Sequence, residues 1–500
     1  MNWIPRLVAI SLLIGSPALA KGKAEHIVIV VWDGLRPDTV NETNTPTLAK
    51  LARDGVFFAN HHAVYLSSTE VNGVALVTGA YPNRNGVMAN REYRPAIDPL
   101  KRIATEALDT VLKADEISSG RYLKLPTLAE ILRRAGLKTA IAGSKPVVLL
   151  HDRADRAHIT MPETTEYVTP NTDGDEATTR ALLAKWDRSV PAFSLLWLSE
   201  PDLSQHDAGP GSTKALAALK SSDQNLALVL RELDAKGVRD KTDVFVVSDH
   251  GFSTIARTVD VAAVLKEAGF NAAREFKQPP EPGDIMVVGN GGSVLFYVIG
   301  HNAPLTQKLV AFLQQQDFVG VVFTREPMRG TFTLDQVRIN TADAPDVVIS
   351  LRWTDQKSST GLPGVLVSDG RTRSPGQGNH TSLSRFDMHA TLIAAGPSFR
   401  RGVMNPLPSS NADLAPTILH LLGVKPPQPM DGRVLTEALT DSGQKTFPPI
   451  EVRTLEAAQD HGKVMWRQYV RITDFGGAFY IDEGNGFSQA FDIEESPAKP

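Results

Sequence analysis

The chain has 500 residues, of which 42% are hydrophobic, and a formal net charge of −4. So mild a charge argues against nucleic acid as a partner, and the absence of cysteine excludes disulfide bonds as a source of stability. The length allows one large α/β domain with an insertion, or two to three smaller domains.

The N-terminal segment, residues 1–20, has the composition of an export signal. A single cation, Arg6, precedes an apolar run over 7–14, and Ala18-Leu19-Ala20 follows. The run is shorter than the roughly 20 residues that a membrane span needs, which favours cleavage after about Ala20 over an anchor. We therefore expect a periplasmic or secreted protein with no integral membrane span after cleavage.

Short apolar runs predict strands that are buried on both faces, at 26–32, 138–143, 192–198 and 243–248. Helical patterns accompany them, at 45–55, 125–136 and 212–237. Alternating strands and helices predict an α/β fold with a doubly wound, mostly parallel sheet sandwiched by helices.

The rest of the chain predicts two further parts. Residues 256–374 mix strand-like and helical runs, which indicates an α+β insertion or cap subdomain. We expect the catalytic domain to consist of 21–255 and 375–450. Residues 451–500 predict a strand-rich C-terminal tail with a terminal hairpin.

Acidic residues follow three of the predicted strands. Asp33 follows the first, Asp202 with His206 follows the third, and Asp249-His250 follows the fourth. A lone acid after a strand is usually a turn or cap residue, but parallel strands deliver their carboxyl ends to one edge. His380, in the glycine-bearing loop GQGNH, is preferred over His389 as a further ligand. Carboxylates and imidazoles together suit two zinc-like ions.

Three hydroxyls, Ser67, Ser68 and Thr69, precede a helical pattern. One of them could cap the helix, because a helix N-terminus has unsatisfied N–H groups. A metal ion could instead lower the pKa of one hydroxyl and make it a nucleophile, and the same helix end would favour an anionic ester. The residues alone leave the choice among the three open.

Five motifs give the chain a family resemblance, and they occur in the family's order over most of 25–260 and 375–425. They are VWDGLRPD, SSTEVNGVALVTGAYPNRNGVMAN, SEPDLSQHDAGP, SDHGF and GNHTSLSRFDMHATLIAAGPSFR. The sequence resembles the alkaline phosphatase superfamily, and within it the type I phosphodiesterase/nucleotide pyrophosphatase branch. Glu70-Val71 stands where that family has Phe-Pro.

The resemblance implies a site and a mechanism. Thr69 would attack the phosphoryl group and form a phosphothreonine, with Asn90 binding the phosphate. Two divalent ions, with Zn²⁺ favoured, would be held in two sets: Asp202, His206 and His380, and Asp33, Asp249, His250 and the Thr69 oxygen. The expected substrate is a small-molecule phosphate ester or nucleotide, cleaved at a phosphodiester or pyrophosphate bond.

Three alternatives remain beside this prediction. Lys145 follows a predicted strand end, and a cation in the site would favour a phosphomonoesterase, whose substrate carries an extra negative charge. A sulfatase-like hydrolase is disfavoured because the Cys- or Ser-x-Pro-x-Arg pattern is absent around 67–72. The third alternative is a metal-binding protein without turnover.

Overall fold

The computed structural model describes residues 22–490, apart from 106, 154–158, 162–168, 371 and 444–445. The predicted export signal at 1–20 lies outside the described residues. In the described part of the chain, no helix combines the length and hydropathy required to cross a membrane.

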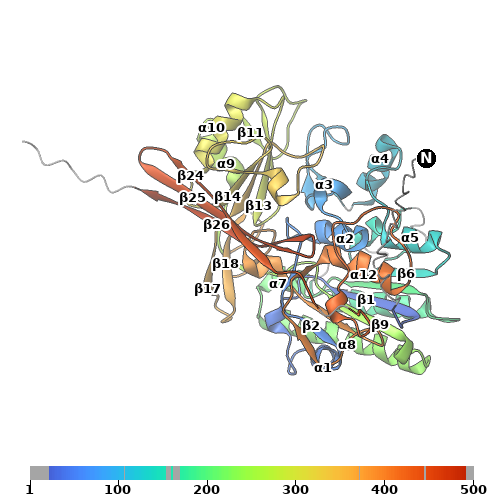
Figure 1. The fold of residues 1–500 in the computed structure, drawn as a ribbon. Helices are drawn as coiled ribbons and strands as arrows, with labels where there is room; N and C mark the ends of the chain where they lie inside the picture. Colours follow the sequence, from blue (N-terminus) through green and yellow to red (C-terminus); the bar gives the residue numbers. More distant parts are fainter. Residues whose placement is uncertain are drawn as a thin grey trace, which may run out of the picture.

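The centre of the molecule is an eight-stranded, mostly parallel sheet in the order β22-β2-β21-β9-β1-β8-β6-β7 (Figure 1). Its strands are β1 (His26–Trp32), β2 (Val56–Phe58), β6 (Thr139–Gly143), β7 (Ile159–Thr160), β8 (Phe193–Leu198), β9 (Thr242–Val247), β21 (Leu392–Ala395) and β22 (Val403–Asn405). The five strands from β9 to β7 are parallel, whereas β21 runs antiparallel to both β9 and β2. The four strands predicted from the sequence are confirmed to within one residue.

Helices cover both faces of this sheet. The side chains of Val28 and Val30 pack with α1 (Pro46–Asp54), α6 (Thr172–Ala184) and α8 (Thr213–Ala235). Those of Ile27, Ile29 and Val31 pack on the opposite face with α2 (Thr69–Thr78), α5 (Leu128–Arg134) and α12 (Leu414–Leu421). Because β1 is apolar at consecutive positions, it can be buried from both sides. The predicted doubly wound α/β fold is confirmed.

The segment between β9 and β21 builds two more sheets. A six-stranded sheet contains β11 (Ala272–Ala273), β12 (Ile285–Gly289), β13 (Ser293–Val298), β14 (Val319–Thr324), β15 (Phe332–Thr333) and β16 (Val347–Leu351). It packs against α9 (Val261–Glu267) and α10 (Ala303–Leu313). A four-stranded sheet contains β10 (Ser253–Val259), β17 (Trp353–Lys357), β18 (Pro363–Asp369) and β19 (Gly378–Asn379).

The C-terminal strands form an antiparallel sheet of β24 (Glu451–Asp460), β25 (Val464–Phe475) and β26 (Ala478–Ala490). In Figure 1 this red sheet runs alongside the yellow six-stranded sheet, where β25 and β26 contact β14. Val470, Ile472 and Phe479 share a buried apolar cluster with Val71 of α2 and Leu295 of β13. Helix α2, the six-stranded sheet and the C-terminal sheet therefore share one core.

Shorter elements complete the described chain: β3 (His61–His62), α3 (Pro82–Asn85), β4 (Arg91–Glu92), β5 (Ile103–Ala104), α4 (Leu108–Ser118), α7 (Asp202–Ala208), α11 (Arg385–Met388), β20 (His389–Ala390) and β23 (Ser409–Ser410).

Candidate metal centre and active site

The carboxyl ends of three adjacent parallel strands bring three acids together. Trp32 at the end of β1 pairs with Leu198 at the end of β8, and Val31 pairs with Val247 at the end of β9. Asp33 directly follows β1, Asp202 comes three residues after the residue that follows β8, and Asp249 is the second residue after β9. All three carboxylates are buried.

One group of ligand atoms consists of Asp202, His206 and His380. Asp202 and His206 lie one turn apart on α7, while His380 comes from the loop after β19. The Oδ1 atom of Asp202 lies 3.3 Å from Nε2 of His206 and 3.6 Å from Nε2 of His380. Three ligand atoms at such separations can surround one metal ion.

A second group consists of Asp33, Asp202 and His250. The Nε2 atom of His250 lies 3.6 Å from Oδ1 of Asp33 and 3.3 Å from Oδ2 of Asp249. The Thr69 hydroxyl lies 3.3 Å from the same nitrogen. The rings of His250 and His380 stack with centroids 3.7 Å apart, so the two groups are adjacent.

Backbone carbonyls orient all three imidazoles. The Nδ1 atoms of His206, His250 and His380 lie 3.0, 2.8 and 2.9 Å from the carbonyl oxygens of Gly378, Gly251 and Ser67. A ring that donates from Nδ1 keeps Nε2 free to bind a metal ion. Each Nε2 faces a carboxylate of the cluster.

The acids present unused oxygens to these nitrogens. Oδ1 of Asp33, Oδ1 of Asp202 and Oδ2 of Asp249 are buried and have no hydrogen-bond partner among the described residues. Buried carboxylates in this condition are paired with a cation in most proteins. The mixed carboxylate and imidazole set therefore fits divalent metal ions of the zinc type.

Burial and the neighbouring charges together shift the pKa values of the three acids in different directions. Burial, reinforced by the neighbouring charge of Asp249, raises the pKa of Asp33 well above its usual value. Burial also raises the pKa of Asp249, to about 7. Burial would raise that of Asp202 too, but the charges of His206 and Lys145 outweigh it and hold the pKa well below the usual value. A cluster with this much like charge favours bound cations.

Lys145 points into the cluster from the chain that follows β6. Its Nζ atom lies 2.9 Å from Oδ2 of Asp33 and 2.6 Å from Oδ2 of Asp202, and the residue is buried. These contacts use the Oδ2 atoms and leave the unpartnered Oδ1 atoms toward the imidazoles. Lys145 therefore positions both carboxylates and adds a positive charge to the site.

Thr69 is the first residue of α2, so its hydroxyl lies at the helix N-terminus. The side chain of Asn72, one turn further on, accepts a hydrogen bond from the N–H of Val64 and donates to the carbonyls of Val64 and Ser68. Asn411 then donates from its amide to Oδ1 of Asn72 and to the carbonyl of Asp249. The side-chain amides of Asn72 and Asn411, both buried, thus connect the loop that precedes Thr69 with the loop that contains Asp249.

The other two hydroxyls do not cap the helix, so the capping interpretation is wrong for both. Ser68 occupies the N-cap position, but its side chain makes no capping hydrogen bond, and the hydroxyl of Ser67 donates to the carbonyl of Ser382. Tertiary contacts that bury this loop override the local preference for capping.

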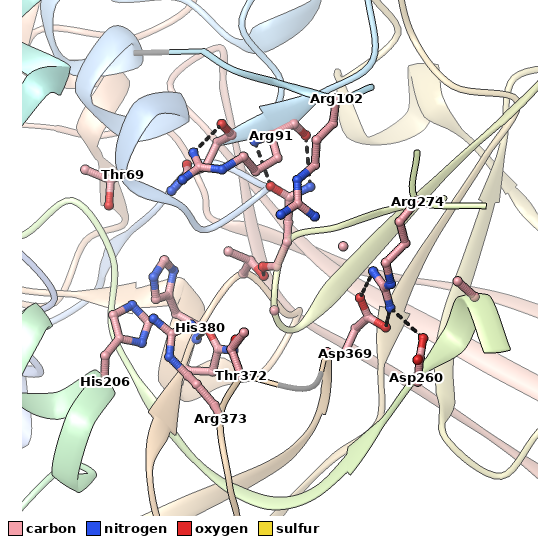
Figure 2. A pocket seen from close by; sticks show the side chains of 18 of the residues that line it. Thr69, Arg91, Arg102, His206, Asp260, Arg274, Asp369, Thr372, Arg373 and His380 are labelled. Atoms are coloured by element: carbon pink, nitrogen blue, oxygen red, sulfur yellow. Dashed lines mark hydrogen bonds and ion pairs between the residues drawn. The ribbon is translucent and has the colours of Figure 1, made fainter. Parts of the chain in front are cut away.

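A cavity of about 840 Å³ opens beside Thr69, and Asn90, Lys145, Asp202, His206 and His380 also line it. The Oδ1 atom of Asn90 accepts a hydrogen bond from the N–H of Glu70, 3.2 Å away. Its amide nitrogen is therefore the polar atom left to donate to a ligand. Figure 2 shows Thr69, His206 and His380 on one side of this cavity and several arginines across it.

The sequence analysis missed two features of the site. The connection through Asn411 joins residues that are far apart in the chain, and no local pattern signals it. Arg102 and Arg373 line the cavity from loops outside the five motifs. His389, which was not chosen as a ligand, lies in β20, and its Nε2 atom contacts the carbonyl of Ala59 instead.

Comparisons with known proteins show which family the chain resembles. The family model for "Type I phosphodiesterase / nucleotide pyrophosphatase" matches residues 27–353. Mouse ectonucleotide pyrophosphatase/phosphodiesterase family member 3 is 24% identical over 45% of this chain, and human family member 7 is 22% identical over 87%. The match spans about 24% of the length of the mouse protein and 89% of the human one.

Solved structures show the same fold. Murine ectonucleotide pyrophosphatase/phosphodiesterase 5, in an inactive form in complex with AMP, covers 83% of this chain with a TM-score of 0.61 and 18% identity. The human member 5 structure gives a TM-score of 0.63 and 17% identity. Both structures are covered over their full length. The chain belongs to the type I phosphodiesterase/nucleotide pyrophosphatase family.

Proposed function

We propose that this protein hydrolyses phosphodiester or pyrophosphate bonds in small-molecule phosphate esters such as nucleotides, through a phosphothreonine on Thr69. The observation that carries the proposal is the position of the Thr69 hydroxyl, 3.3 Å from Nε2 of His250 at the edge of the buried acid cluster. Family membership and the AMP complex of the murine structure support the same class of substrate.

Two divalent ions, with zinc favoured, would be held by Asp202, His206 and His380 and by Asp33, Asp249, His250 and Thr69. When bound, they would supply positive charge that lowers the pKa of the threonine hydroxyl and stabilises the leaving oxygen.

The residues of the chain perform the remaining tasks. The N-terminus of α2 attracts the anionic ester and aims its phosphorus at Thr69 Oγ1. Attack forms the Oγ1–P bond and breaks the P–O bond to the leaving group in line with it. Asn90 donates its amide to an equatorial oxygen, where negative charge accumulates. Water then cleaves the Oγ1–P bond and releases phosphate or its monoester.

The test is zinc-dependent release of p-nitrophenol from bis-p-nitrophenyl phosphate. Thr69→Ala should lower turnover by roughly 10⁴-fold or more, since loss of a nucleophile costs that much, while bound zinc stays nearly unchanged. Ser68→Ala is the matched control and should keep most activity. Loss of turnover in Ser68→Ala with activity retained in Thr69→Ala would show that Ser68, and not Thr69, is the nucleophile. Bound zinc with no turnover of any phosphate ester would indicate a binding protein.

A second candidate function is phosphomonoester hydrolysis. The buried ammonium of Lys145 supports it, because a monoester dianion carries more negative charge than a diester and gains more from an added cation. Comparing kcat/KM for p-nitrophenyl phosphate and bis-p-nitrophenyl phosphate separates the two: preference for the monoester favours the second candidate.

A further inference from the structure

The cavity beyond the metal centre is lined by cations from several parts of the chain. They are Arg91, Arg102, Lys266, Arg274 and Arg373. In Figure 2, Arg102 and Arg274 lie across the cavity from Thr69, and Arg373 extends toward His206. Such a wall attracts anions, but its charge depends on which cations already have acidic partners.

Arg274 is neutralised within the protein. Its guanidinium lies 2.9 and 2.7 Å from the two oxygens of Asp369 and 3.1 Å from Oδ1 of Asp260. This bidentate pair fixes the arginine to β18. Arg91 is held differently, because its Nη1 donates to the carbonyl of Asn90, 2.9 Å away.

Arg102 and Arg373 differ from these two. Within the described residues, neither guanidinium forms an ion pair with a carboxylate. Burial, together with the charges of Arg91 and Arg274, lowers the pKa of Arg102. Burial also lowers the pKa of Arg373, with the charge of Asp202 acting in the opposite direction. The charges of Asp369 and Asp202 act on Arg102 and Arg373 without a direct ion pair among the described residues, so both guanidinium groups can offer N–H donors to a ligand anion at the cavity wall.

The same wall lacks a surface for an aromatic base. Among the described residues that line the cavity, none is Phe, Tyr or Trp. Proteins that hold a nucleobase by stacking place such rings against its face. The described wall instead offers guanidinium groups, whose planar arrays of N–H donors match phosphate and carboxylate.

We propose that the substrate carries a second anionic group, a phosphate or a carboxylate, and that Arg102 and Arg373 bind it from the two sides of the cavity. This inference rests on the proposed function, which puts the reacting phosphoryl group beside Thr69. The second anion then interacts with the wall beyond His206 and contributes to binding without taking part in bond cleavage.

The test measures equilibrium binding to the zinc-loaded Thr69→Ala protein by calorimetry. Three ligands of equal chain length are compared: propyl phosphate, 3-(phosphonooxy)propanoate and propane-1,3-diyl bisphosphate. A second anion should tighten binding by about 10- to 100-fold, the scale of one or two hydrogen bonds to charged groups. The carboxylate and phosphate ligands show which anion is preferred.

The arginines are then replaced in the same background. In Arg102→Gln/Arg373→Gln, both charged-tail ligands should bind within about threefold of propyl phosphate. Arg231→Gln, on the exposed surface of α8, is the matched control and should retain the preference.

Equal affinity for the three ligands, or a preference that survives the double substitution, would overturn the inference. Tighter binding of AMP than of the bisphosphate, unaffected by the double substitution, would overturn it as well and indicate a base-binding slot. Hydrolysis of the nitrophenyl esters by the unmodified protein is measured separately. Its failure would contradict the proposed function while leaving the binding result to decide on the anion subsite.

Discussion

At the scale of single residues, one hydrogen bond fixes the orientation of the Asn90 side chain, which we propose takes part in catalysis. Its carbonyl oxygen is occupied by the N–H of Glu70, so the amide group has one orientation, with its nitrogen available to the cavity. A donor fixed in advance stabilises developing charge without reorganisation.

We predict that Asn90→Ala lowers kcat by about 10²- to 10³-fold, the usual cost of losing one donor to a developing oxyanion. Bound zinc, measured by elemental analysis, should be unchanged, because Asn90 forms no hydrogen bond with the acid cluster in the described part of the chain. An unaffected kcat would exclude Asn90 from the reaction.

We propose that Lys145 affects which phosphate esters the site prefers. We predict that Lys145→Met lowers the ratio of monoester to diester kcat/KM by roughly tenfold or more, since a dianion loses more attraction than a monoanion does. Methionine keeps a similar length without charge. The zinc content serves as the control, because Lys145 also positions Asp33 and Asp202. A ratio that stays constant would restrict Lys145 to positioning.

At the scale of elements, α2 depends on the loop that precedes it. The side chain of Asn72, in the first turn of the helix, hydrogen-bonds the backbone of Val64. Asn411, in the short turn that precedes α12, donates a further hydrogen bond to Asn72. These buried amides hold Thr69 against the edge of the sheet where the acids lie.

We predict that Asn72→Ala lowers the free energy of unfolding by about 2–4 kcal/mol, because it leaves several buried backbone groups without partners. Turnover should fall as well, since the Thr69 loop loses its anchor. Urea denaturation and kcat/KM measure the two effects. Asn72→Asp keeps the acceptor for Val64 and should be intermediate in stability; equal losses for both variants would argue against this network.

The short strand β3 carries a buried, neutral histidine. Burial lowers the pKa of His61 from its ordinary 6.5 to about 3, although the hydrogen bond with Asn411 opposes this. Between these values the unfolded chain binds a proton that the folded chain does not, so the stability that His61 contributes is lost as the pH falls.

We predict that lowering the pH from 7 to 5 removes about 2 kcal/mol of stability through His61, at about 1.4 kcal/mol per pH unit below 6.5. His61→Gln cannot take up a proton in this range, so its free energy of unfolding should depend less steeply on pH. Urea denaturation at both pH values measures the free energy of unfolding of the two proteins. An equal loss of stability between pH 7 and pH 5 in both would contradict the prediction.

At the scale of the whole molecule, the candidate metal centre gathers segments that span the chain from Asp33 to His380. A metal ion that binds this arrangement and not the unfolded chain stabilises the entire fold. The C-terminal sheet contributes to the same assembly, since Val470 and Phe479 share a core with α2.

We predict that chelation of zinc lowers Tm, and that free zinc at a hundredfold excess over Kd adds about 3 kcal/mol of stability. The dependence of Tm on free zinc, followed by calorimetry, measures this coupling. His206→Ala removes one ligand and should weaken the dependence, while His389→Ala, outside the cluster, should preserve it. A Tm independent of zinc in the unmodified protein would contradict a metal centre.

The doubly wound core, and the acids that follow its strands, could be predicted from the amino-acid sequence. Runs such as 26–32 are apolar at every position, and this local pattern requires a strand that is covered on both faces. Because parallel strands end at one edge of a sheet, the sequence predicts that Asp33, Asp202 and Asp249 lie close together.

The contacts that these groups make with other parts of the chain could not be predicted from local sequence patterns. The contacts of Lys145 with two carboxylates, the amide link through Asn411 and the positions of Arg102 and Arg373 all depend on packing between distant segments. The contribution of the C-terminal strands to the core around α2 is of the same kind. Local patterns record which face of an element is buried, whereas the identity of the neighbour that buries it is set by long-range packing.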